Sequence, residues 1–104
     1  MKEKDLKCDT VYYFDFGRSQ GGHAYIGRIL NDGSSDLGSF LDECGKSYRT
    51  KVEANGHGFG GDGGAKSARP ATKEEIKWLE ACEKANEYVA FKDVRLYLIQ
   101  LIQF

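Results

Sequence analysis

The sequence predicts an α+β fold, in which a small curled antiparallel sheet of three to four strands packs against a C-terminal amphipathic helix. Two observations lead to this prediction. The first half contains runs of β-branched and aromatic residues separated by glycine-containing turns. The second half contains a complete helix start followed by apolar residues at helical spacing. The chain has 104 residues, so we expect a single domain over residues 1–104 with a small core.

The strands are predicted from their composition and from the turns between them. Residues 11–16 and 23–30 are rich in β-formers, and the link between them is short enough for an antiparallel hairpin. Residues 31–33 are Asn-Asp-Gly, which tolerate positive φ, and they lead into a third segment at 37–41. Residues 46–53 alternate loosely and predict a further strand, which completes the sheet.

A glycine-rich segment at residues 55–68 contains six glycines and few apolar side chains, which predicts a flexible loop. Two of its spacings match Gly-x-Gly-x-x-Gly, but a dinucleotide site needs a strand before and a helix immediately after the glycines. The loop also contains His57 and Phe59, with Lys66 and Arg69 behind them. Such a loop can close over a ligand or a partner, or serve only as a connector.

The helix is predicted to begin after Thr72, because Thr72 and Glu75 have the spacing of a capping box and Pro70 discourages an earlier start. The apolar face expected to pack on the sheet comprises Trp78, Leu79, Cys82, Ala85 and Val89. An acidic ridge is expected on the opposite side, formed by Glu80, Glu83 and Glu87. The ridge is either a solvated face or a contact for a basic partner surface.

Residues 94–104 fit either a short helix or a strand, with helix slightly favoured. Both faces of this segment are rather apolar, which predicts burial on two sides or a homodimer contact.

Charge and cysteine usage exclude several classes of protein. The formal net charge of −1 gives no overall attraction to nucleic acid. Cys8, Cys44 and Cys82 form no Cys-x-x-Cys pair, so neither a disulfide framework nor a zinc knuckle is indicated. The charged N-terminal residues do not resemble a signal peptide, and no apolar run is long enough to span a membrane. We therefore expect a cytoplasmic protein that makes no membrane contact.

No pattern of residues indicates an enzyme. The histidines and cysteines match no known spacing of metal ligands, and no nucleophile has a base near it in sequence. We expect no catalytic residues, no metal and no cofactor, and hence a protein that works by binding.

Basic side chains suggest one local binding surface. They form two triplets, Lys46, Arg49 and Lys51 and then Lys66, Arg69 and Lys73. The first triplet surrounds Tyr48, which is the minimal combination for phosphate contacts and base stacking on a sheet. If the two triplets lie close together, they form one patch for RNA or for an acidic protein face. The simpler interpretation is that these basic residues are scattered over the surface and form no binding patch.

The helical stretch Arg-Pro-Ala-Thr-Lys-Glu-Glu-Ile-Lys-Trp-Leu-Glu-Ala-Cys, continued to residue 89, resembles the closing helix of small accessory proteins of bacteriophages and prophages. The resemblance covers a fifth of the chain and includes no catalytic residues. The glycine-rich loop and the apolar residues after Asp93 depart from that pattern.

In such phage proteins the assigned role is often inhibition of host defence, and anti-CRISPR proteins are the best-known class. The resemblance therefore implies a non-enzymatic inhibitor that acts in the host cell cytoplasm. Its expected partner is a CRISPR effector nuclease or the guide RNA complex of that nuclease. The alternative is a small RNA- or DNA-binding accessory module that uses the sheet around Tyr48.

Overall fold

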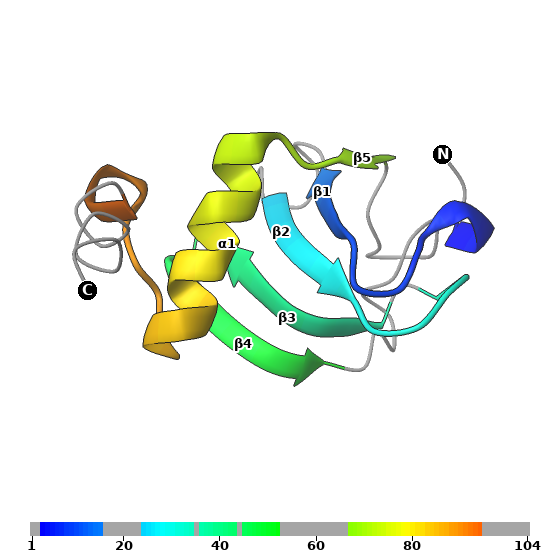
Figure 1. Cartoon of the computed structure of the whole chain (residues 1–104), viewed down its shortest axis with the longest axis horizontal. Coiled ribbons are helices and arrows are strands. Elements are labelled where there is room, and N and C mark those ends of the chain that lie inside the picture. The colour runs from blue at the N-terminus through cyan, green and yellow to red at the C-terminus, as the bar shows by residue number, and fades with distance from the viewer. Residues whose placement is uncertain (1–2, 16–23, 35, 44, 53–66, 95–104) are drawn as a thin grey trace.

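A computed structural model describes residues 3–15, 24–34, 36–43, 45–52 and 67–94. It shows an α+β fold in which one helix lies across an open five-stranded antiparallel sheet of order β4-β3-β2-β1-β5 (Figure 1). The elements are η1 (Glu3–Asp5), β1 (Val11–Asp15), β2 (Ala24–Ile29), β3 (Leu37–Asp42), β4 (Ser47–Val52), β5 (Ser67–Pro70) and α1 (Lys73–Ala85). Residues 91–94 form a further helical turn. The predicted fold class is confirmed.

The first four strands form an antiparallel meander, and the predicted turn residues 31–33 lie between β2 and β3. Strands β1 and β2 pair from Val11 opposite Arg28 to Asp15 opposite Ala24. In the turn between β2 and β3, Gly33 has φ of 72°, and its N–H donates to the Leu6 carbonyl at 2.8 Å. The positive φ suits glycine because it has no Cβ. This bond ties the N-terminal segment to the turn.

The fifth strand, β5, is a correction to the predicted three to four strands. It begins at Ser67, inside the segment predicted as a loop at 55–68, and pairs antiparallel with β1. The sequence Ser-Ala-Arg-Pro has little β-propensity, so only the pairing partner reveals it. Arg69 lies opposite Tyr13, and its guanidinium carbon is 4.2 Å from the centre of the Tyr13 ring. His57, Phe59 and Lys66 lie outside the described residues.

The sheet buries apolar side chains on both faces because successive residues of a strand point to opposite sides. On the face that α1 covers, the buried residues are Val11, Ile26, Leu41, Trp78, Leu79, Ala81, Cys82 and Val94. On the other face they are Leu6, Tyr12, Phe14, Ile29, Leu37 and Phe40. Gly27 belongs to this second face, where a Cβ would lie 2.9 Å from Leu37 Cδ2. A larger residue in the middle of β2 would therefore force the Leu37 side chain to shift.

The helix ends earlier than its apolar pattern suggests. It stops at Ala85, and Asn86 follows in the left-handed conformation with φ of 54°. The Asn86 N–H donates to the Glu83 carbonyl and the Glu87 N–H to the Cys82 carbonyl, as in a Schellman motif. The predicted continuation to Val89 is therefore wrong.

Beyond the cap, the chain folds back onto the helix. The Trp78 indole N–H donates to the Val89 carbonyl at 2.6 Å, and the Val89 N–H donates to Cys82 Sγ at 3.4 Å. Val94 is buried against the same core, so its side chain is unavailable for the predicted dimer contact. The other residues of that segment, 95–104, lie outside the described part of the chain.

The capping box at the start of α1 is confirmed and has a measurable consequence. Thr72 Oγ1 accepts from the Glu75 N–H at 3.2 Å, and Glu75 Oε1 accepts from the Thr72 N–H at 2.8 Å. Replacing Thr72 with alanine should lower the free energy of unfolding by about 1 kcal/mol, since an N-cap acceptor is lost. Urea denaturation measures the change. Thr72→Ser keeps the oxygen and should lose less; equal losses for both variants would contradict a capping role.

Candidate functional site

The three glutamates of the predicted acidic ridge do not form one solvent-facing row. Glu83 faces the sheet, where its carboxylate accepts from Arg28 Nε and Nη2, both at 2.9 Å, and from Ser39 Oγ at 2.6 Å. Glu80 is half-buried, and Glu87 is exposed but follows the end of the helix. The prediction that Glu83 belongs to a solvent-facing ridge is therefore wrong. The sequence spacing could have indicated that Glu83 faces the sheet. Glu83 lies four residues after the buried Leu79, so the two residues share a face of the helix.

The Arg28–Glu83–Ser39 network holds its charges inside the fold. Burial raises the pKa of Glu83, but hydrogen bonds from Arg28 and Ser39 outweigh burial and leave the net pKa below its usual value. The hydrogen bond to Glu83 raises the pKa of Arg28, against the opposing effect of burial. Arg28 Nη1 also donates to the Asp9 carbonyl at 3.1 Å. The network joins the helix to β2 and β3, and its charges are already paired.

The described members of the two basic triplets do not come together at one edge of the sheet. Arg49 and Lys51 belong to β4 and Lys46 precedes that strand, whereas Arg69 belongs to β5. Three strands separate these edges (Figure 1). Lys73 begins α1, and Lys66 lies outside the described residues. Lys46, Arg49 and Lys51 therefore do not join Arg69 in a single basic patch on one sheet edge.

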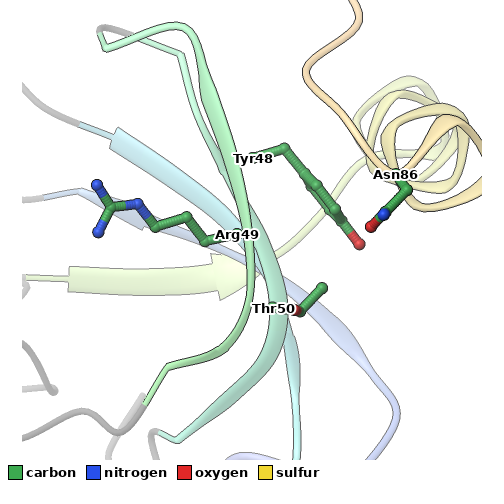
Figure 2. Close-up of a pocket in the computed structure, with 4 residues that line it drawn as sticks. All are labelled: Tyr48, Arg49, Thr50 and Asn86. Carbon is green, nitrogen blue, oxygen red and sulfur yellow. The ribbon is translucent and has the colours of Figure 1, made fainter.

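Tyr48 and Arg49 point to opposite sides of β4. Figure 2 shows Tyr48 directed toward Asn86 at the end of α1, while Arg49 extends to the other side of the strand. Tyr48 is half-buried and packs on the core that α1 covers. Burial, and secondarily the Glu83 carboxylate, raises the pKa of its phenol. Tyr48 therefore does not share a stacking surface with the Arg49 guanidinium.

A cavity of about 420 Å³ lies beside β4 and is lined by Tyr48, Arg49, Thr50 and Asn86 (Figure 2). The strand supplies three of these residues, and the left-handed cap of α1 supplies the fourth. Sequence reasoning identified Tyr48 and Arg49 but missed Thr50 and Asn86. An asparagine after a helical run is a signal for such a cap. The signal does not indicate which strand the cap will approach.

Arg49 differs from the other two arginines that the structure describes. Arg28 is held by Glu83, and Arg69 donates to both carboxylate oxygens of Glu75 at 2.8 and 2.9 Å. Arg49 is exposed and forms no ion pair with another residue of the described ranges. Of the three described arginines, Arg49 is therefore the one that forms no ion pair with a described glutamate.

The two described cysteines differ in their exposure. Cys8 is exposed, and its thiol donates to the Leu30 carbonyl at 3.1 Å. Cys82 is buried, and burial raises the pKa of its thiol. Within the described ranges, no group of three or more His, Cys, Asp or Glu side chains has an arrangement that could hold a metal ion. In those same ranges, no helix has both the length and the apolar character needed to cross a membrane.

Comparison of this chain with protein-family models, with curated proteins and with solved structures finds no match.

Proposed function

We propose that this protein is a non-enzymatic inhibitor that binds a bacterial defence protein through the edge of its sheet at β4. The observation that carries the binding role is the combination at this edge of an exposed Arg49, which forms no ion pair with the other described residues, and a pocket formed with the helix cap. Binding surfaces of this kind join a charged group that fixes orientation to a recess that accepts a side chain.

The class of partner is proposed from the resemblance of residues 69–89 to the closing helix of phage accessory proteins. On the basis of this resemblance, the proposed partner is a CRISPR effector nuclease or its guide RNA complex in the host cytoplasm. The contacts on this chain would come from β4 and the adjoining cap, including Tyr48, Arg49, Thr50 and Asn86.

The arrangement of the basic residues favours a protein partner over the alternative of an RNA- or DNA-binding module. A nucleic-acid surface on a sheet needs basic side chains and aromatic rings on the same face. Here Arg49 and Tyr48 lie on opposite sides of β4, and Arg69 is at the far edge, where Glu75 neutralises it. The aromatic ring on the Arg49 side is that of Tyr25, which is half-buried and packs against Phe40 with 4.8 Å between the ring centres, so less of it is open to a stacking base.

The proposed function is tested with the tagged full chain in a lysate that contains a CRISPR effector. We expect the effector nuclease to be retained after ribonuclease treatment, and we expect expression of the chain to protect phage in a defended host. Recovery of RNA together with proteins that ribonuclease releases would favour the nucleic-acid module. Failure to retain any effector, together with failure to protect phage, would contradict the proposal.

A further inference from the structure

The two edges of the sheet differ in their capacity to accept another strand. β5 has four residues, includes Pro70, which has no N–H to donate, and has its arginine held by Glu75. β4 has six residues and contains neither proline nor glycine. Among the described strands, β4 pairs only with β3. Backbone groups on its outer side are a template for strand addition.

The charge of this edge indicates what such a strand would be. Residues 46–52 include Lys46, Arg49 and Lys51 and no acidic residue. A second copy of this chain that paired through the same strand would bring two positively charged strands together, which is unfavourable. A strand with acidic side chains would instead meet the Arg49 guanidinium, and a charge-assisted hydrogen bond there displaces no ion pair to a described residue.

Alternate side chains of an added strand would contact opposite faces of β4. One set would lie beside Arg49, and the other set would lie beside Tyr48 and Thr50, at the open pocket that Asn86 also lines (Figure 2). The position of Asn86 in the lining of the pocket is fixed because its backbone is hydrogen-bonded to the end of α1. The pocket is open to solvent, and its volume of about 420 Å³ can accept an added side chain.

We propose that β4 receives an extended acidic segment of a protein partner as an additional edge strand. Carboxylates of that segment pair with Arg49, and its alternate side chains enter the cavity beside Tyr48, Thr50 and Asn86. This inference rests on the proposed function only for the identity of the protein that supplies the segment.

The probe is a disulfide-cyclised hairpin peptide whose outer strand is Thr-Glu-Val-Glu-Val-Glu-Thr, because a preformed strand loses less entropy on binding. Fluorescence anisotropy of the labelled peptide measures affinity for the full chain. Arg49→Glu should weaken binding by about tenfold or more, since it replaces attraction with repulsion. Lys73→Glu makes the same change of charge at the exposed start of α1, near the other edge, and should leave affinity within about twofold.

Amide hydrogen exchange distinguishes strand addition from a contact between side chains alone. Alternate amides of an edge strand face away from their only neighbour, so an added strand should slow exchange within residues 47–52. Binding of the peptide without added protection in β4 would overturn the proposal. So would equal losses for Arg49→Glu and Lys73→Glu, or tighter binding of a peptide with lysine in place of glutamate.

A single-stranded oligouridylate is the competing probe. If it bound more tightly than the acidic peptide and Arg49→Glu abolished its binding, the edge would be a nucleic-acid contact and the proposal would be wrong. The outcomes for function are separate. Retention of a CRISPR effector by both wild type and Arg49→Glu would overturn the β4 inference and the binding edge named in the proposed function, while the inhibitory role would stand. Peptide binding at β4 without any retained effector would overturn the proposed function alone.

Discussion

Replacing Leu79 with alanine is expected to lower the free energy of unfolding by about 2–5 kcal/mol, because it leaves a cavity at the contact between helix and sheet. The Leu79 side chain is 0 % exposed and belongs to the core that includes Leu41 and Ile26, which are also fully buried. A domain of this size has a net stability of only about 5–15 kcal/mol. The substitution therefore removes a large part of the stability.

Urea denaturation of both proteins, followed by circular dichroism, measures this loss. Lys77→Ala is the matched control, because Lys77 is exposed on the same helix and alanine favours helix at that position. We expect the control to change stability by about 0.5 kcal/mol or less. Similar losses in the two variants would show that α1 does not pack on the sheet through Leu79.

Arg28→Met is expected to lower the free energy of unfolding by about 2–3 kcal/mol at neutral pH. It leaves the Glu83 carboxylate without its main partner under the helix. Breaking a fully buried pair costs about 3–5 kcal/mol, and the smaller figure allows for solvent screening of this partly exposed pair. The two side chains are 25 % and 24 % exposed.

The cost of Arg28→Met should depend on pH in a definite direction. The folded-state pKa of Glu83 lies below the reference value of 4.5. Its pairing therefore contributes stability in full above pH 4.5, and the contribution is lost as the pH falls through the folded-state pKa. When Glu83 is protonated, the variant no longer buries an unpaired charge. Removing Arg28 raises the folded-state pKa of Glu83 in the variant relative to wild type, because burial then has less opposing it. The difference in stability between wild type and variant should therefore shrink as the pH falls from the variant's Glu83 pKa through the lower folded-state pKa of the wild type.

Denaturation across this pH range, with Glu83→Leu and the double variant Arg28→Met/Glu83→Leu, tests the coupling. The double variant should lose less stability than the sum of the two single variants, because no charge is left unpaired. Additive losses, or a loss for Arg28→Met that is unchanged by acid, would show that the Arg28 and Glu83 charges are not coupled.

Much of the fold could be predicted from the sequence because the signals are local. β-Forming runs separated by glycine-containing turns located the first four strands, although their ends shifted by one or a few residues. Thr72 and Glu75 specified the start of α1, and Trp78, Leu79 and Cys82 specified its buried face. In each case, the residues that form the structure are near neighbours in the chain.

Tertiary structure decided the features in which distant segments meet. β5 exists because β1 offers it a partner, since Ser67–Pro70 has little strand propensity of its own. Glu83 is held by Arg28 and Ser39, which lie 55 and 44 residues away in sequence, so its acidic spacing along the helix was misleading.

The candidate site also depends on strand order. The sequence determined that Lys46, Arg49 and Lys51 flank Tyr48, and it made a basic surface there a reasonable hypothesis. Alternation along the predicted strand already puts Tyr48 and Arg49 on opposite faces. Only the folded sheet placed β4 and β5 at opposite edges and brought Asn86 into the pocket that Tyr48 and Thr50 line. Local propensity sets where elements begin and which residues share a face, whereas pairing between distant strands sets which faces and edges remain available to a partner.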